Sequence, residues 1–169
     1  MKKKTLLFLL AANVLLLTLS WIMALIAYPR LPQEMPLWIN FIKQQAILMK
    51  KSLLFFIYPS LQTLFCLGFW WLSRVNFSFK LPQGSQKCSI SEVKALYASL
   101  RKEFIYLTLI FFNLIFIHLQ RSLIFLAHTI GEGVNRFYFS LLFVIILILI
   151  LNYRLRVKLI ARKARLIKK

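Results

Sequence analysis

Four long apolar segments, separated by stretches rich in Lys and Arg, dominate the pattern of the sequence. Spanning a hydrocarbon core of about 30 Å takes about 20 residues of helix. The apolar runs are continuous and longer than the alternating strands of about ten residues that build membrane barrels. Since only helices and closed barrels satisfy their own backbone hydrogen bonds in lipid, the pattern predicts four membrane helices, over residues 5–28, 52–73, 104–120 and 137–153.

The third apolar segment is short, because the charged residue Arg121 follows only 17 residues after Phe104. An Arg at the bilayer centre costs about 3 kcal/mol. We therefore expect the helix to end near Gln120, with Arg121 at the outer interface and residues 122–130 along the membrane surface. The alternative is a tilted helix that continues to Ala127 while the Arg121 side chain snorkels.

Composition excludes several classes of protein. Of the 169 residues, 60% are hydrophobic and only 16% are charged, and the mean hydropathy is +0.74. A small globule buries only about two-thirds of its unfolded surface, so a soluble enzyme, a secreted disulfide scaffold and a disordered tail are all excluded. The first apolar stretch is longer than the core of about 7–15 residues found in signal peptides, so we expect it to remain as an anchor.

The charge distribution predicts the orientation. There are 23 Lys and Arg against 4 acidic residues. Basic residues number 3 before the first segment, 6 in the 74–103 loop and 8 in the 154–169 tail, but only 4 and 2 in the two remaining loops. Because Lys and Arg resist translocation, the count predicts an all-α, four-helix integral membrane protein with both termini cytoplasmic, in a bacterial cytoplasmic (inner) membrane.

The 74–103 loop, which this orientation places in the cytoplasm, contains an amphipathic pattern. Ser89 and Glu92 form a capping box, and apolar residues then recur at helical spacing: Val93, Leu96, Tyr97, Leu100 and Phe104. We expect a helix over about 90–103 that lies on the cytoplasmic membrane surface and leads into the third membrane helix. The alternative is a helix that docks a partner.

The tail over 154–169 is basic without any acidic residue. Such a segment next to a membrane helix binds anionic lipid, with about 1 kcal/mol from each cation. The expected lipid contacts are Arg154, Arg156, Lys158, Arg162, Lys163 and Arg165. Nucleic acid is not expected as a partner, because the sequence contains no recognition motif.

Weakly polar residues inside the apolar segments indicate helix packing. Asn13 and Ser20 lie on one face of the first segment, Gln62 lies in the second and Asn113 in the third. Such residues hydrogen-bond across close helix contacts in membranes, and each bond contributes about 0.6–2 kcal/mol. Asn13 is expected to pair with Asn113 or with Gln62. The fourth segment has almost no such residue, so we expect it to present apolar faces to lipid or to another subunit.

Candidate chemistry is sparse. Hydrolase, P-loop and dinucleotide-binding motifs are absent from the sequence, and no ionisable residue lies near the centre of an apolar segment. His118, His128 and Glu132 are the one conceivable set of metal ligands, and their interfacial position favours ordinary loop residues over a metal site. The sequence therefore predicts no catalytic residue, no metal and no cofactor.

The first outer loop, Leu31-Pro32-Gln33-Glu34-Met35-Pro36-Leu37-Trp38-Ile39-Asn40, resembles the LPxxxPxHxN signature of a bacterial membrane domain found in SdpI-like immunity proteins. Pro32, Pro36 and Asn40 match in register, and Lys51 falls at the family's Lys before the second helix. Trp38 stands at the position of the family's His. The resemblance implies an immunity or signalling protein that recognises an extracytoplasmic ligand through loop 29–51. From the residues alone, the loop is either a rigid elbow between the first two helices, because its prolines restrict the backbone, or a binding surface at Trp38 and Asn40.

Three functional hypotheses follow. The first is a non-catalytic accessory protein that packs against a larger membrane partner or against itself. The second is the SdpI-like protective or signalling protein. The third is a small transporter or a subunit of a membrane enzyme, which would need a partner to supply ionisable groups.

Overall fold

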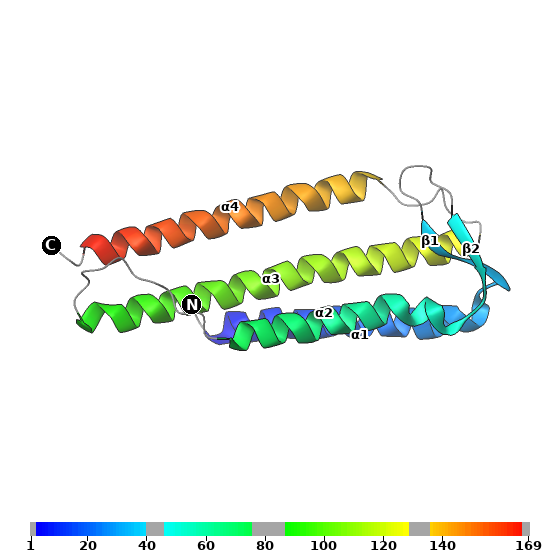
Figure 1. Cartoon of the computed structure of the whole chain (residues 1–169), viewed down its shortest axis with the longest axis horizontal. Helices are drawn as coiled ribbons and strands as arrows, with labels where there is room; N and C mark the ends of the chain where they lie inside the picture. Colours follow the sequence, from blue (N-terminus) through cyan, green and yellow to red (C-terminus); the bar gives the residue numbers. More distant parts are fainter. Residues whose placement is uncertain (1–2, 40–45, 76–86, 129–135, 167–169) are drawn as a thin grey trace.

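The computed structural model describes residues 3–39, 46–75, 87–128 and 136–166. Four long helices make up most of it: α1 (Lys3–Ala27), α2 (Ile57–Arg74), α3 (Lys87–Ala127) and α4 (Arg136–Leu166) (Figure 1). Each is long and apolar enough to cross a membrane, which confirms the four expected segments. The chain is a multi-pass membrane protein.

Helix α3 lies at the centre of the bundle. Helices α1 and α2 pack against each other and against one side of α3, while α4 lies along the other side (Figure 1). Helix α1 begins and α4 ends at the same end of the bundle, which we call the termini end, and a β-hairpin covers the opposite end, the hairpin end.

The hairpin is an element that the sequence analysis did not predict. Strands β1 (Glu34–Ile39) and β2 (Ala46–Lys50) pair antiparallel, with a register shift between Pro36 and Trp38. Short 3-10 turns connect the hairpin to the helices, at Tyr28–Arg30 and Leu53–Phe56. Beneath it lies a buried apolar cluster of Ala24, Leu31, Met35 and Phe55. The described residues of loop 29–51 therefore form a cap over this end of the bundle.

Helix α3 corrects two expectations. It runs unbroken for 41 residues, so the amphipathic stretch over 90–103 is collinear with the membrane helix and is not a separate helix lying on the surface. The expected end near Gln120 is also wrong, and the alternative, a helix that continues to Ala127, is confirmed: Ser122 and Leu123 are buried on the next turn, and Leu123 packs against Tyr58. Burial against α2 and the hairpin outweighs the presence of Arg121, whose side chain is exposed.

Helices α3 and α4 extend beyond the other two at the termini end (Figure 1). Arg101 of α3 binds carbonyl groups at the C-terminal end of α2, so α2 ends at the level of Arg101. Residues 87–100 of α3 therefore lie beyond the end of α2. Helix α4 continues through the basic tail to Leu166. We call residues 87–100 and 155–166 together the extension; at a rise of 1.5 Å per residue, each arm is about 20 Å long.

Candidate functional site

A polar network lies in the middle of the three-helix core. Asn113 of α3 is fully buried, and its Nδ2 donates to Oδ1 of Asn13 at 2.9 Å. Its Oδ1 accepts from Nε2 of Gln62 at 3.0 Å and from Sγ of Cys66 at 3.6 Å. Asn13 Nδ2 in turn donates to the carbonyl of Tyr106 at 3.1 Å. Asn113 therefore joins α1, α2 and α3 at one level.

A second polar contact joins α1 to α3 nearer the hairpin. Ser20 Oγ donates to Oε1 of Gln120 at 2.7 Å, and Gln120 Nε2 donates to the carbonyl of Ser20 at 3.2 Å. Both side chains are fully buried. The sequence indicated Ser20 as a packing residue, whereas Gln120 was considered only as the end of the third membrane helix. Their contact could not be predicted, because the two residues are one hundred positions apart and only the packing of α1 against α3 brings them together.

Basic residues mark where the apolar part of the bundle stops at the termini end. The guanidinium of Arg101 donates to the carbonyls of Val75 and Leu72, both at 2.9 Å, and so binds the C-terminal end of α2, where carbonyl groups lack helical partners. Arg74 and Arg154 lie at the corresponding points of α2 and α4. We call this level the termini belt. Arg121 is 20 residues beyond Arg101, about 30 Å along the helix, which matches the thickness of a hydrocarbon core.

The residues singled out in loop 29–51 separate into two groups. Lys51 joins the two ends of the loop: its Nζ donates to the carbonyls of Pro29 and Leu31, both at 3.1 Å, and lies 5.2 Å from the centroid of the Tyr28 ring. Pro32 is exposed. Pro36 and Trp38 lie in β1, on either side of its register shift, and Asn40 lies outside the described residues.

The structure does not bring His118 and His128, two of the three residues considered as metal ligands, close together. The His118 ring stacks on Tyr138 of α4, with 3.8 Å between centroids. His128 follows ten residues later, directly after the end of α3, which separates the two by about 15 Å, and Glu132 lies outside the described residues. Among the residues that the structure describes, no group of three or more His, Cys, Asp and Glu could hold a metal ion.

Polar and ring contacts attach helix α4 to the bundle at two levels. Near the hairpin end, Tyr138 donates its hydroxyl to the carbonyl of Leu114 at 3.2 Å. Near the termini belt, Tyr153 stacks on Phe104, and Arg156 Nη1 donates to Oε1 of Glu103 at 2.9 Å. Among the described residues of α4, Leu142 is the one that is buried.

The side of α4 that faces away from α3 is a continuous apolar seam. Its members are at least half exposed and alternate at spacings of four and three residues, as coiled-coil seams do. We call them the outward seam: Phe137, Leu141, Val144, Ile148, Leu151 and Leu155. The seam covers the whole apolar length of α4 and continues past Arg154 into the extension.

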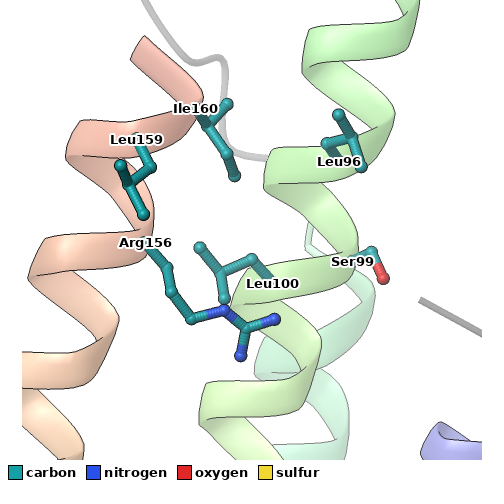
Figure 2. A pocket seen from close by; sticks show the side chains of 6 residues that line it. All are labelled: Leu96, Ser99, Leu100, Arg156, Leu159 and Ile160. Carbon is teal, nitrogen blue, oxygen red and sulfur yellow. The ribbon is translucent and has the colours of Figure 1, made fainter. Parts of the chain in front are cut away.

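A groove lies between the two arms of the extension (Figure 2). It encloses about 240 Å³ and is lined by Leu96, Ser99 and Leu100 of α3 and by Arg156, Leu159 and Ile160 of α4. Leu100 is buried at its floor, whereas Leu159 is 60% exposed at its wall. A smaller cavity lined in part by Leu107 and Leu149 continues the space toward the apolar part of the bundle. The groove was not expected from the sequence, because residues 90–103 were expected to lie along the membrane surface.

The basic residues of the tail are placed along α4. Arg154, Lys158 and Arg162 are exposed, and Arg156 is engaged by Glu103. The side chains of Lys163 and Arg165 lie outside the described part. The basic residues therefore extend from the termini belt along the helix and are not confined to one membrane depth.

The arrangement offers surfaces for binding, namely the outward seam and the groove, and two polar contacts that hold the core together.

Comparison of the chain with protein-family models, with curated proteins and with solved structures finds no match.

Proposed function

We propose that this chain is a non-catalytic accessory protein in a bacterial cytoplasmic membrane, where its α4 binds a larger membrane protein through the outward seam. In this proposal both ends of the chain are cytoplasmic. The orientation is supported by the excess of Lys and Arg in the segments that would then face the cytoplasm.

The observation that carries this proposal is the exposure of the outward seam and its continuation among the cations of the tail. Within the hydrocarbon, acyl chains cover apolar side chains as well as another helix does. Leu155, however, directly follows Arg154 and is 60% exposed, and Leu159 one turn further is 60% exposed as well. Exposed leucines that alternate with exposed cations favour a partner helix that continues beside α4 at this level.

Self-association through the same seam is less favourable. A coiled-coil spacing continued past Leu155 reaches Lys158 and then Arg162, so two parallel copies would place like charges at their contact. Like charges opposed in an interface cost free energy. A larger partner with a different sequence avoids this repulsion.

Site-specific cross-linking tests the proposal. A photoreactive amino acid is placed at Ile148 in the outward seam, and at Leu64 of α2 as the control, since both are exposed apolar positions within a predicted span. We expect irradiation of intact cells to give a discrete product from position 148 that is heavier than two copies of the 20.0 kDa chain, and none from position 64. A product of only two copies, or no discrete product from position 148, contradicts the proposal.

A further inference from the structure

We infer that the C-terminal end of α2 binds the phosphate group of an anionic phospholipid, with Arg74 as the residue that binds the phosphate and Trp70 as the ring that positions Arg74. The site lies on α2, whereas the outward seam and the basic tail belong to α4, so the inference does not rest on the proposed function. Its observations are the geometry of the Arg74 side chain, the charge around it and its depth in the membrane.

The Arg74 side chain is held in place by a ring. It is exposed, and its guanidinium carbon lies 3.7 Å from the centroid of the Trp70 ring. Stacking covers one flat face of a guanidinium, while the N–H groups point outward in its plane and can donate to a ligand. A guanidinium fixed in this way binds a phosphate through two parallel hydrogen bonds and loses less side-chain entropy on binding.

The donors of Arg74 are not used by the protein. Arg101 donates to the carbonyls of Leu72 and Val75, both at 2.9 Å, and so brings a second guanidinium to the same helix end. Within the described part of the chain, Arg74 makes no hydrogen bond or ion pair. Two cations at one helix end favour an anionic ligand.

The acidic groups among the described side chains lie elsewhere. Glu103 pairs with Arg156 of α4 at 2.9 Å, and Glu34 lies in β1, at the hairpin end. Neither carboxylate competes for Arg74, so the ligand has to come from outside the described chain.

The depth of Arg74 indicates which anion lies beside it. The candidate span Leu53–Arg74 ends at this residue, and its 22 residues are about 33 Å long, close to the thickness of a hydrocarbon core. Trp71 is 66% exposed on the same turn, as is typical of aromatic side chains at the membrane–water interface. The guanidinium therefore lies at the level of the lipid phosphates. A net negative phospholipid is favoured over a zwitterionic one, whose own cation would approach Arg74 and Arg101.

Fluorine NMR gives a readout from the site itself. The full chain is labelled with 5-fluorotryptophan in detergent micelles, and the Trp70 resonance is the one missing from Trp70→Phe. We expect phosphatidylglycerol to shift this resonance with a midpoint about fivefold lower than that of phosphatidylcholine with the same acyl chains. Trp21, whose Nε1 donates to Oγ1 of Thr63 at 3.1 Å, is the internal control and should not shift.

Variants test the role of Arg74. Arg74→Gln should raise the midpoint for phosphatidylglycerol about fivefold, and Arg74→Lys, which keeps the charge and loses the planar fork, about threefold. Arg154→Gln is the matched control: it removes an exposed Arg from α4 that has no ring contact among the described residues, and the midpoint should change less than about twofold. Equal midpoints for the two lipids, or equal effects of Arg74→Gln and Arg154→Gln, overturn the inference.

Thermal unfolding in the same micelles tests the positioning role of Trp70. Phosphatidylglycerol should raise the Tm of the chain by about 2 °C or more. This rise should be retained in Trp70→Phe, which keeps a ring under Arg74, and reduced in Trp70→Leu. Trp71→Leu removes the neighbouring, more exposed ring and should retain the rise; equal reductions in Trp70→Leu and Trp71→Leu contradict the role of Trp70.

Inorganic phosphate distinguishes a lipid headgroup from a free anion. Sodium phosphate at the same concentration as the lipid should leave the Trp70 resonance in place, because it lacks the acyl chains that bring a headgroup to this depth. A shift with sodium phosphate that matches the shift with phosphatidylglycerol and is lost in Arg74→Gln would assign the site to free phosphate, and the lipid inference would be wrong.

Discussion

The side-chain amides of Asn13 and Asn113, one hundred residues apart in sequence, are joined by a hydrogen bond of 2.9 Å inside the bundle. The bond fixes α1 against α3 in rotation and in register, because both helices are otherwise apolar at this level and could slide. Double-mutant cycles in a membrane protein give about 0.6 kcal/mol on average for such bonds, with a maximum of about 1.7. We expect a coupling energy within that range for Asn13→Ala and Asn113→Ala, measured by unfolding in mixed micelles; additive effects contradict a direct bond.

Replacement of Asn113 should cost more than replacement of Gln62. Asn113 contacts three side chains, whereas Gln62 makes one side-chain hydrogen bond among the described residues, and its Oε1 is buried without a partner there. Asn113→Leu should lower the free energy of unfolding by about 1–3 kcal/mol, and Gln62→Leu by less than about 1 kcal/mol. Asn152→Leu, at an exposed position of α4, is the control and should change stability by less than about 0.5 kcal/mol. The reverse order of the two core variants contradicts this assignment.

Arg101 should stabilise the end of α2. Its guanidinium donates to two carbonyls there, and hydrogen bonds to charged groups contribute about 1.5–3 kcal/mol each when buried, less when partly exposed. Arg101→Gln should therefore lower the free energy of unfolding by about 1–3 kcal/mol. Lys102→Gln removes the same charge from the next, exposed position and should have little effect. An equal loss in both variants would mean that net charge, and not the two hydrogen bonds, is responsible.

Lys51 should hold the two ends of loop 29–51 together. Its Nζ binds two carbonyls and lies over the Tyr28 ring, a contact to which the cation–π interaction adds about 0.5–1 kcal/mol. Lys51→Met should lower stability by about 1–2 kcal/mol and raise the rate of proteolysis at loop 29–51. Lys50→Met, at the exposed neighbouring position, should leave the proteolysis rate unchanged; a similar rise there would argue against a specific role for Lys51.

The sequence was sufficient to predict the four helices, because continuous apolar runs of this length leave a chain no place but lipid. It also indicated which polar residues would lie between helices. For Asn13 it left Asn113 and Gln62 as alternatives, and the structure joins Asn13 to Asn113 directly and Gln62 to Asn113. A polar group in lipid needs a partner, but the choice among partners depends on helix rotation.

Two features could not be predicted from local pattern, and a third, the end of α3, was left between two alternatives. The hairpin lacks alternation, and Pro36 within β1 cannot donate to a ladder, so its strands carried a weak signal. The continuation of α3 past Arg121 depends on the burial of Leu123 against Tyr58, a tertiary contact. The groove depends on α3 and α4 continuing side by side at the termini end. The sequence of the 74–103 loop does not indicate that it packs beside the tail, and the sequence of the tail does not indicate it either.

The central claim is that the chain crosses the bilayer four times with the termini end in the cytoplasm. It is tested by labelling single cysteines in intact cells with a membrane-impermeant maleimide, in a Cys66→Ser, Cys88→Ser background. Gln33→Cys, at the hairpin end, should be labelled from outside, and Lys102→Cys, at the termini belt, should be labelled only after the cells are opened. Labelling of Lys102→Cys in intact cells, or protection of Gln33→Cys until lysis, contradicts the account.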